Sequence, residues 1–111
     1  MDAAEEQALR AQAQKGAELM DEQTPGWGTH LTFLFLLDMG DPEYSILALV
    51  YGDIGTGLEA LGITYRQAER LGLIAKSRRD SAKELEEIAV LNGIWSQLAR
   101  VRNLAANTIP A

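Results

Sequence analysis

The residues that could perform acid–base catalysis are few in this chain of 111 residues. His30 is the only histidine. A general base built on it would need a carboxylate partner within hydrogen-bond reach, for which Asp38 and Asp53 are the candidates. A small hydrolase or transferase that uses these residues is therefore one hypothesis. A lone histidine is more often a surface or capping residue, and we predict that the protein is not an enzyme.

Metal and cofactor sites find equally little support in the sequence. A metal site would have to combine His30 with carboxylates such as Asp38, Asp41 and Asp53, but no H-E-x-x-H or similar spacing is present. Asp38, Asp41 and Glu43 do not follow the twelve-residue pattern of a calcium loop, and Asp41 is better explained as a helix cap. The absence of cysteine excludes a thiol nucleophile and thiolate ligands. We expect no cofactor and no metal.

The stretch YGDIGTGLEALGITYRQAERLGL, residues 51–73, holds five of the ten glycines in the chain. An apolar run followed by Gly52, Gly55 and Gly57 and then a helix has the outline of a phosphate-binding loop. However, the lysine of a P-loop is absent, and the spacing is not G-x-G-x-x-G. Asp53 would also repel a phosphate. A nucleotide site is therefore disfavoured.

The same stretch also has the outline of a helix-turn-helix, with LGIT as its turn. Tyr65, Arg66 and Arg70 would then face outward toward phosphates or base edges, beside the basic segment KSRR. Two features argue against DNA binding: both helices would be short, and Glu69 would lie on the reading face. A helix-turn-helix regulator remains an alternative function.

A third interpretation is that the glycines end short helices. Gly52, Gly62 and Gly72 recur every ten residues, each where a helix should stop, and glycine adopts the left-handed conformation of a helix end without a steric penalty. We prefer this interpretation. It predicts that the apolar residues of the stretch pack against Trp95 and Leu98: Leu58, Leu61, Ile63, Ala68 and Leu71.

The net charge of −6 is unevenly distributed. Residues 1–59 carry eleven acidic and two basic side chains, or −9, whereas residues 60–80 carry five basic and two acidic side chains, or +3. An acidic body repels a polyanion, so nucleic acid is a disfavoured partner. The acidic part suggests a further alternative, a nucleic-acid mimic that inhibits a host enzyme.

The candidate partner-binding residues are an aromatic residue in a loop and the exposed residues of the basic segment. Trp27 lies in the loop PGWG, and tryptophan is enriched at binding interfaces. Trp95, by contrast, falls on an apolar stripe and is expected in the core. The predicted partner-binding residues are Trp27, Tyr65, Arg66, Arg70, Arg78 and Arg79.

Hydrophobic periodicity and capping signals predict an all-α fold in which longer N- and C-terminal helices surround several short ones. Residues 31–37 and 46–51 leave an alternative, because they are apolar enough to pair as two strands of an α+β fold. The sequence DPE predicts a helix start after Asp41, and SAKE predicts a capping box at Ser81. The predicted helices cover residues 2–22, 43–51, about 56–62, 65–71 and a long segment from Ser81.

The last helix carries a predicted core stripe at helical spacing. Its members are Leu85, Ile88, Leu91, Trp95, Leu98 and either Val101 or Arg102.

Several blocks of the chain resemble a family of small proteins encoded by phages and prophages of actinobacteria. These blocks span about residues 16–102, and their mutual spacing is more specific than any one of them. They are GAELMDEQTPGW (16–27), LDM (37–39), YGD (51–53), GLEALGITYRQAERLGL (57–73) and LNGIWSQLARVR (91–102). Two positions depart from the family pattern, which tends to have a cysteine near Ser45 or Ile46 and an aromatic residue where Leu73 stands. The resemblance implies a phage accessory protein and carries over no site residue.

We therefore predict a single globular helical domain over residues 1–106 and a tail over residues 107–111. No apolar run approaches the ~20 residues that span a bilayer, so no membrane association is expected. The predicted function is a non-catalytic phage protein that binds a host or phage protein in the host cytoplasm. A homodimer paired through the amphipathic terminal helices is a related expectation.

Overall fold

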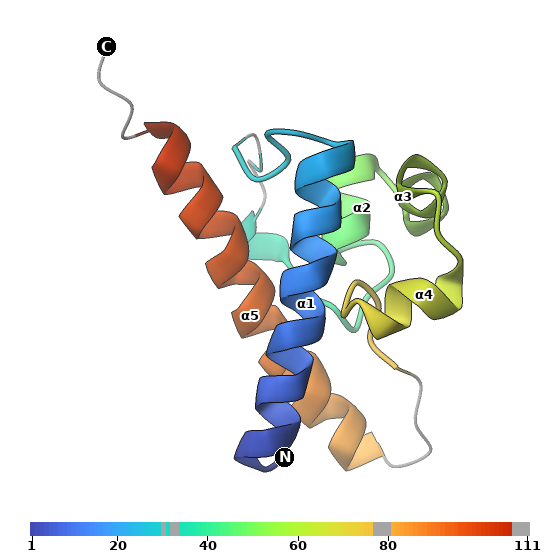
Figure 1. Ribbon diagram of the computed structural model, residues 1–111. Helices are drawn as coiled ribbons and strands as arrows, with labels where there is room; N and C mark the ends of the chain where they lie inside the picture. Colours follow the sequence, from blue (N-terminus) through green and yellow to red (C-terminus); the bar gives the residue numbers. More distant parts are fainter. Residues whose placement is uncertain (30, 32–33, 77–80, 108–111) are drawn as a thin grey trace.

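Two long helices form the frame of the protein. The computed structural model describes residues 1–29, 31, 34–76 and 81–107, and within them it contains helices and no strand. Helices α1 (Ala3–Gln23) and α5 (Ser81–Asn107) lie against each other. Figure 1 shows that both run in the same direction, with their N-terminal ends at the bottom of the view. They separate toward their C-terminal ends.

The short elements connect and cover this pair. They are η1 (Leu34–Leu36), a single 3-10 turn, and the helices α2 (Ile46–Tyr51), α3 (Ile54–Leu61) and α4 (Tyr65–Arg70). Helix α3 packs on both α2 and α1, and Figure 1 shows α2, α3 and α4 on one side of α1. The predicted all-α arrangement is confirmed. The alternative sheet is wrong for the described residues, because the proposed second strand is helix α2.

Polar caps explain where the short helices begin. The Ser45 hydroxyl accepts a hydrogen bond from the Ala48 N–H at 3.4 Å, and Asp53 accepts one from the Thr56 N–H at 2.6 Å. At α4, Thr64 and Gln67 form a reciprocal capping box. These bonds satisfy N–H groups that a helix start leaves without an intrahelical partner.

The predicted helix start at residue 43 is wrong. Asp41 does not cap a helix at residue 43: its carboxylate accepts the Glu43 N–H at 2.9 Å, and its carbonyl accepts the Tyr44 N–H at 3.0 Å. These bonds close a turn, which delays α2 until the better placed cap, Ser45. At α5, the helix begins at Ser81, as the sequence predicts. The helix continues to Asn107, one residue past the predicted domain boundary.

Glycines do end helices, as predicted. Gly52, Gly62 and Gly72 have φ angles of 97°, 67° and 65°, and they follow α2, α3 and α4. Gly72 has a second constraint, because a Cβ there would lie 3.1 Å from the backbone nitrogen of Ala13 on α1. Gly55, by contrast, lies inside α3 and ends nothing.

The core stripe of α5 is rotated from the predicted one. Leu91 and Trp95 are fully buried, as expected, and Leu98 is half-buried. Leu85 and Val101, however, are 67% and 56% exposed, so they do not belong to the core. The positions that replace them in the core are Ile94 and Ala99.

The glycine-rich stretch contributes to the same core. Leu61 and Ala68 are buried, and three further predicted residues are half-buried against the core: Leu58, Ile63 and Leu71. The indole N–H of Trp95 donates to the carbonyl of Gly72 at 2.7 Å. This bond ties the end of the glycine-rich stretch to α5.

Candidate functional site

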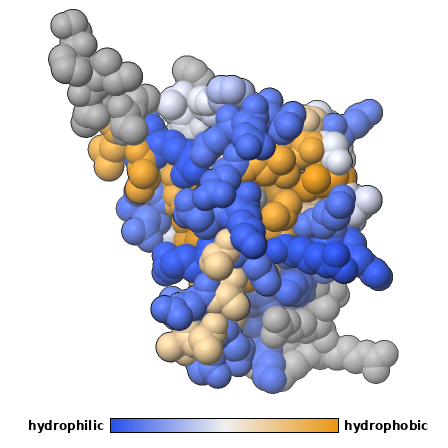
Figure 2. All heavy atoms as spheres, viewed as in Figure 1, coloured by the Kyte–Doolittle hydropathy of each residue, from blue (hydrophilic) through white to orange (hydrophobic). Residues whose placement is uncertain are grey.

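A groove of about 500 Å³ opens between α1 and α5 where the two helices separate. The α1–α5 groove is lined by Arg10, Gln14, Asp21, Ile94, Gln97, Leu98, Val101 and Arg102. In Figure 2, hydrophobic side chains reach the surface near the C-terminal end of α5, beside the hydrophilic ridge that α1 forms. The hollow therefore has two chemically different walls.

The wall from α1 is polar. Arg10, Gln14 and Asp21 follow one another on nearly the same edge of the helix, and Glu18 lies close to this edge. The buried face of α1 is adjacent to this edge and contains three small residues together with Leu9 and Met20. Small residues such as Ala13 and Ala17, both fully buried, let α1 pack closely on its neighbours.

The wall from α5 is apolar. Ile94 is buried and forms the base, Leu98 is half-buried, and Val101 is 56% exposed. Leu104, one helical turn farther along, is 63% exposed. The apolar surface thus begins in the core and continues along α5 to the outside of the protein. Helix α1 does not cover this part of α5, because the two helices separate toward their C-terminal ends and α1 ends at Gln23.

Polar bridges cross the groove at both ends. Near the N-terminal end, Arg10 donates to the side-chain oxygen of Gln97 at 3.3 Å. At the other end, Arg102 binds both carboxylate oxygens of Asp21, with its Nε and Nη2 each at 2.7 Å. A bidentate ion pair of this kind fixes the relative orientation of the two side chains better than a single hydrogen bond does.

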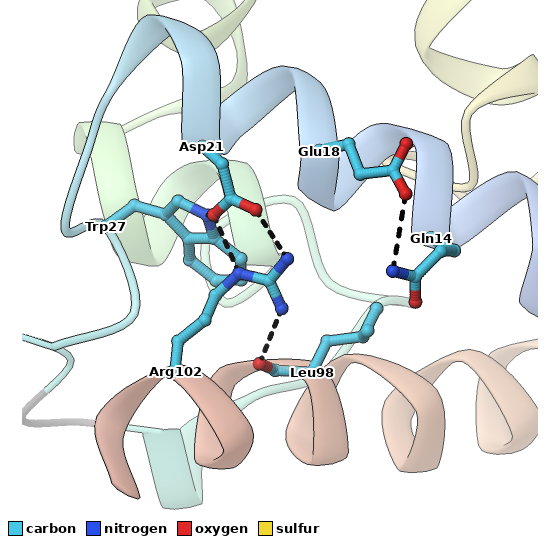
Figure 3. Close-up of polar contacts among 6 residues, drawn as sticks. All are labelled: Gln14, Glu18, Asp21, Trp27, Leu98 and Arg102. Atoms are coloured by element: carbon cyan, nitrogen blue, oxygen red, sulfur yellow. Dashed lines mark hydrogen bonds and ion pairs between the residues drawn. The ribbon is translucent and has the colours of Figure 1, made fainter. Parts of the chain in front are cut away.

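Trp27 completes the second bridge, as Figure 3 shows. Its indole N–H donates to Asp21 at 2.9 Å, and the guanidinium of Arg102 lies 5.1 Å from the centre of its ring. The ring also meets Trp95 edge to face, with centroids 6.0 Å apart and planes at 67°. Arg102 is further held by the Leu98 carbonyl, to which it donates at 3.0 Å. The loop can approach α5 this closely because residue 28 is a glycine. A Cβ at this position would lie only 2.8 Å from the Cβ of Arg102.

This network determines the electrostatics of the groove end. The hydrogen bonds from Arg102 lower the pKa of Asp21, and the bond from Trp27 lowers it further, while partial burial opposes both. Asp21 and Arg102 both stay ionised, and their opposite charges compensate each other within the protein. What the groove offers to a partner is the apolar strip of α5 and the charged edge of α1.

The structure separates the predicted partner-binding residues. Trp27 is only 4% exposed, so it belongs to the core and supports the groove from behind, which corrects the expectation of an exposed anchor. Tyr65, Arg66 and Arg70 lie on α4 and are exposed, Tyr65 by 54%. Arg78 and Arg79 lie outside the described residues.

The two helices of the proposed helix-turn-helix are present, but both are short. Helix α3 has eight residues and α4 has six, joined at Gly62. Arg66 and Arg70 are one turn apart on α4, and within the described residues neither forms an ion pair.

The residues considered for catalysis serve local structure where they are described. Asp53 caps α3, and the Thr56 N–H lowers its pKa. Asp38 accepts the N–H of Gly40 at 2.9 Å in a turn. His30 lies outside the described residues. Among the described residues, no three His, Cys, Asp or Glu side chains cluster closely enough to hold a metal ion.

The acidic residues of the first 59 positions are partly committed to the fold. Asp2, Asp38, Asp41 and Asp53 each accept a backbone N–H at a helix start or turn. Asp21 is paired with Arg102. No described helix is long and apolar enough to cross a membrane.

The groove itself was not found from the sequence. Asp21 and Arg102 are 81 residues apart in the sequence, and nothing in the local pattern around either residue links them. The signal that was present is the continuation of apolar residues on α5 past Ala99, at Val101 and Leu104.

Comparisons with known proteins assign no family to the chain. No family model matches it, and neither a curated protein nor a solved structure matches.

Proposed function

We propose that this chain is a non-catalytic, phage-encoded protein that acts in the host cytoplasm by binding a host or phage protein, and that the α1–α5 groove is its binding surface. The observation that carries the proposal is the apolar strip that leaves the core along α5 and ends in the exposed Val101 and Leu104. The phage origin rests on the sequence blocks described above.

The physical argument is one of burial. Covering an exposed valine or leucine side chain contributes roughly 1.5–3 kcal/mol, and neighbouring exposed apolar residues mark interaction sites more often than scattered ones do. Val101 and Leu104 are three residues apart, so they lie on one edge of the helix. Behind them, the Trp27–Trp95 pair and the Asp21–Arg102 bridge hold the strip in place. A rigid apolar edge of this kind loses little entropy when a partner covers it.

The test is a double substitution with a matched control. Val101→Asp/Leu104→Asp places two charges on the apolar strip and should weaken partner binding by about 3 kcal/mol or more, over a hundredfold in Kd. Leu85→Asp introduces the same chemistry at a 67% exposed leucine on the same helix and should leave binding unchanged.

The measurement is quantitative capture by tagged chain from an actinobacterial host carrying the phage, followed by titration with the purified partner. Equal capture by the doubly substituted chain and the wild type would contradict the proposed surface. Turnover of a metabolite by the purified protein, without any specific partner, would contradict the proposed function.

A further inference from the structure

We infer that the occupant of the α1–α5 groove is a second copy of this chain, docked antiparallel about a two-fold axis. The inference rests on the proposed function, because it keeps the groove as the binding surface and names its occupant. It follows from two patterns, one on each of the two helices, whose spacing is symmetric about a central glutamine and whose residues on the two sides complement each other.

The first pattern lies along the edge of α5 that borders the groove, where Gln97 and Val101 line it. Five residues recur there at spacings of three, four, four and three: Val90, Gly93, Gln97, Val101 and Leu104. The spacing is the same in both directions from Gln97. An antiparallel copy centred there sets Leu104 against Val90 of its mate and Val101 against Gly93. Gly93 is exposed, and a Cβ added to it would meet nothing within 4 Å, so a large side chain can approach.

The second pattern lies on α1. Arg10, Gln14 and Glu18 follow at spacings of four, with opposite charges on the two sides of Gln14. Antiparallel pairing of this edge with itself sets Arg10 of each copy against Glu18 of the other. Both side chains are exposed, and their contacts within one copy are long: Arg10 lies 3.7 Å from Glu6 and donates to Gln97 at 3.3 Å, and Gln14 donates to Glu18 at 3.5 Å. They are therefore available to a second chain.

The two patterns belong to one surface. Gln14 and Gln97 line the same groove from opposite walls, and Figure 3 shows Gln14 extending from α1 toward Leu98 on α5, with Glu18 next to it along α1. Their amide groups each donate and accept, so each can bond to its own symmetry mate. A two-fold axis through the groove places α5 beside α5 and α1 beside α1, as in a four-helix arrangement.

Self-complementarity selects this occupant over an unrelated helix. In a two-fold interface every contact occurs twice, so a surface must match itself in shape and in charge. The five-residue edge of α5 pairs larger residues with smaller ones under this symmetry, and the α1 edge pairs a cation with an anion. An unrelated helix would have to match the α5 edge and the charged α1 edge separately. A second copy of the chain carries both matching edges already, because the two-fold axis repeats them.

The experiment is sedimentation equilibrium of the full chain, with charge reversals on α1. We expect the wild type to be dimeric at about 200 µM, a concentration that assembles complexes with a Kd near ~10 µM. Arg10→Glu and Glu18→Arg each set like charges against each other and should raise the dimer Kd by at least ~10-fold. The double variant Arg10→Glu/Glu18→Arg restores both pairs and should return the Kd to within about 3-fold of the wild type.

Two controls keep the result interpretable. Lys15→Glu makes the same charge change as Arg10→Glu at an exposed position of α1 that does not line the groove, and it should leave the Kd unchanged. Circular dichroism melting of each variant checks that the chain stays folded at the temperature of the measurement.

The inference is overturned if the wild type stays monomeric at this concentration, or if the dimer persists unchanged in Arg10→Glu and Glu18→Arg. It is also overturned if the double variant fails to recover. These outcomes differ from failure of the proposed function. A monomeric chain whose capture of another protein still depends on Val101 and Leu104 would remove the second copy and keep the groove as a binding surface.

Discussion

The α1–α5 groove and the surface of α4 both expose side chains suited to a partner, but they differ in what lies behind them. The groove is framed by helices of 21 and 27 residues and is supported by the buried rings of Trp27 and Trp95. Helix α4 has six residues, held by a capping box at Thr64 and a glycine at its end. It exposes Tyr65 and two arginines but buries only Ala68.

The difference determines what each surface can contribute to affinity. Apolar residues on a rigid base contribute by desolvation, which salt hardly weakens. Arginines on a short exposed helix contribute through charge, which is screened beyond about 8 Å at physiological ionic strength. The groove is therefore the better candidate for stable binding, and α4 is suited at most to weak and salt-sensitive contacts.

The largest effect is expected where the two regions are joined. Gly72→Ala forces a left-handed residue and a contact of 3.1 Å with the α1 backbone at Ala13, and should lower the free energy of unfolding by roughly 2–3 kcal/mol. Gly62→Ala has nearly the same φ, 67°, but open space around the new Cβ, so it should cost about 1 kcal/mol.

Urea denaturation of both variants measures the difference. Equal losses would mean that the left-handed conformation alone sets the cost, and that the close approach of Gly72 to α1 is not a constraint on the fold. In that case the contact of Gly72 with α1 would not contribute to holding α4 in place. Only the caps of α4 would then fix its position, and the structural difference between the groove and α4 would have to be explained in another way.

The fold was predictable from the sequence because its signals are local. Thr64 and the glycines at 62 and 72 act through their own backbone conformation and through neighbours a few residues away. Errors arose where two local signals competed. Asp41 before Pro42 is a good cap in isolation, but the same carboxylate also closes a turn, and Ser45 supplies a second start four residues later.

The intermediate effect concerns the bridge that supports the groove. Arg102 lowers the folded-state pKa of Asp21 below its usual range. This stabilisation is therefore present above the unfolded pKa near ~3.9, and it is lost as the pH falls through the folded value. Asp21→Asn should cost about 1 kcal/mol at pH 7, because the carboxylate is half-exposed and screened. The cost should decrease as the pH falls through the folded pKa of Asp21, because the protonated carboxyl group no longer forms the ionised pair.

Thermal unfolding of the wild type and Asp21→Asn between pH 2 and 7 tests this dependence. Glu22→Gln removes the same charge one position along α1 at an exposed site and serves as the control. A constant difference across the pH range would show that shape, rather than the ionised pair, accounts for the contribution of Asp21.

The site was not predictable, for the opposite reason. Asp21 and Arg102 meet only because α1 and α5 pack in parallel, and that packing depends on the whole intervening chain. The PGWG loop carried an ambiguous signal, since tryptophan is common both in interfaces and in cores. Only the tertiary contacts of Trp27 with Trp95 and Arg102 resolve it.

The smallest effect is expected on α4. Arg66→Ala and Arg70→Ala should each change the free energy of unfolding by less than about 0.5 kcal/mol, because both side chains are exposed and, within the described residues, form no ion pair.

In mobility-shift titrations we expect weak DNA binding at low salt that disappears near ~150 mM. Tight, sequence-preferring binding at that salt would reverse the ranking of the two surfaces. It would do so decisively if each arginine variant lowered the salt slope by about one while Val101→Asp/Leu104→Asp bound DNA like the wild type. Such a pattern would place the function on α4, since counterion release depends on phosphate contacts and not on apolar area.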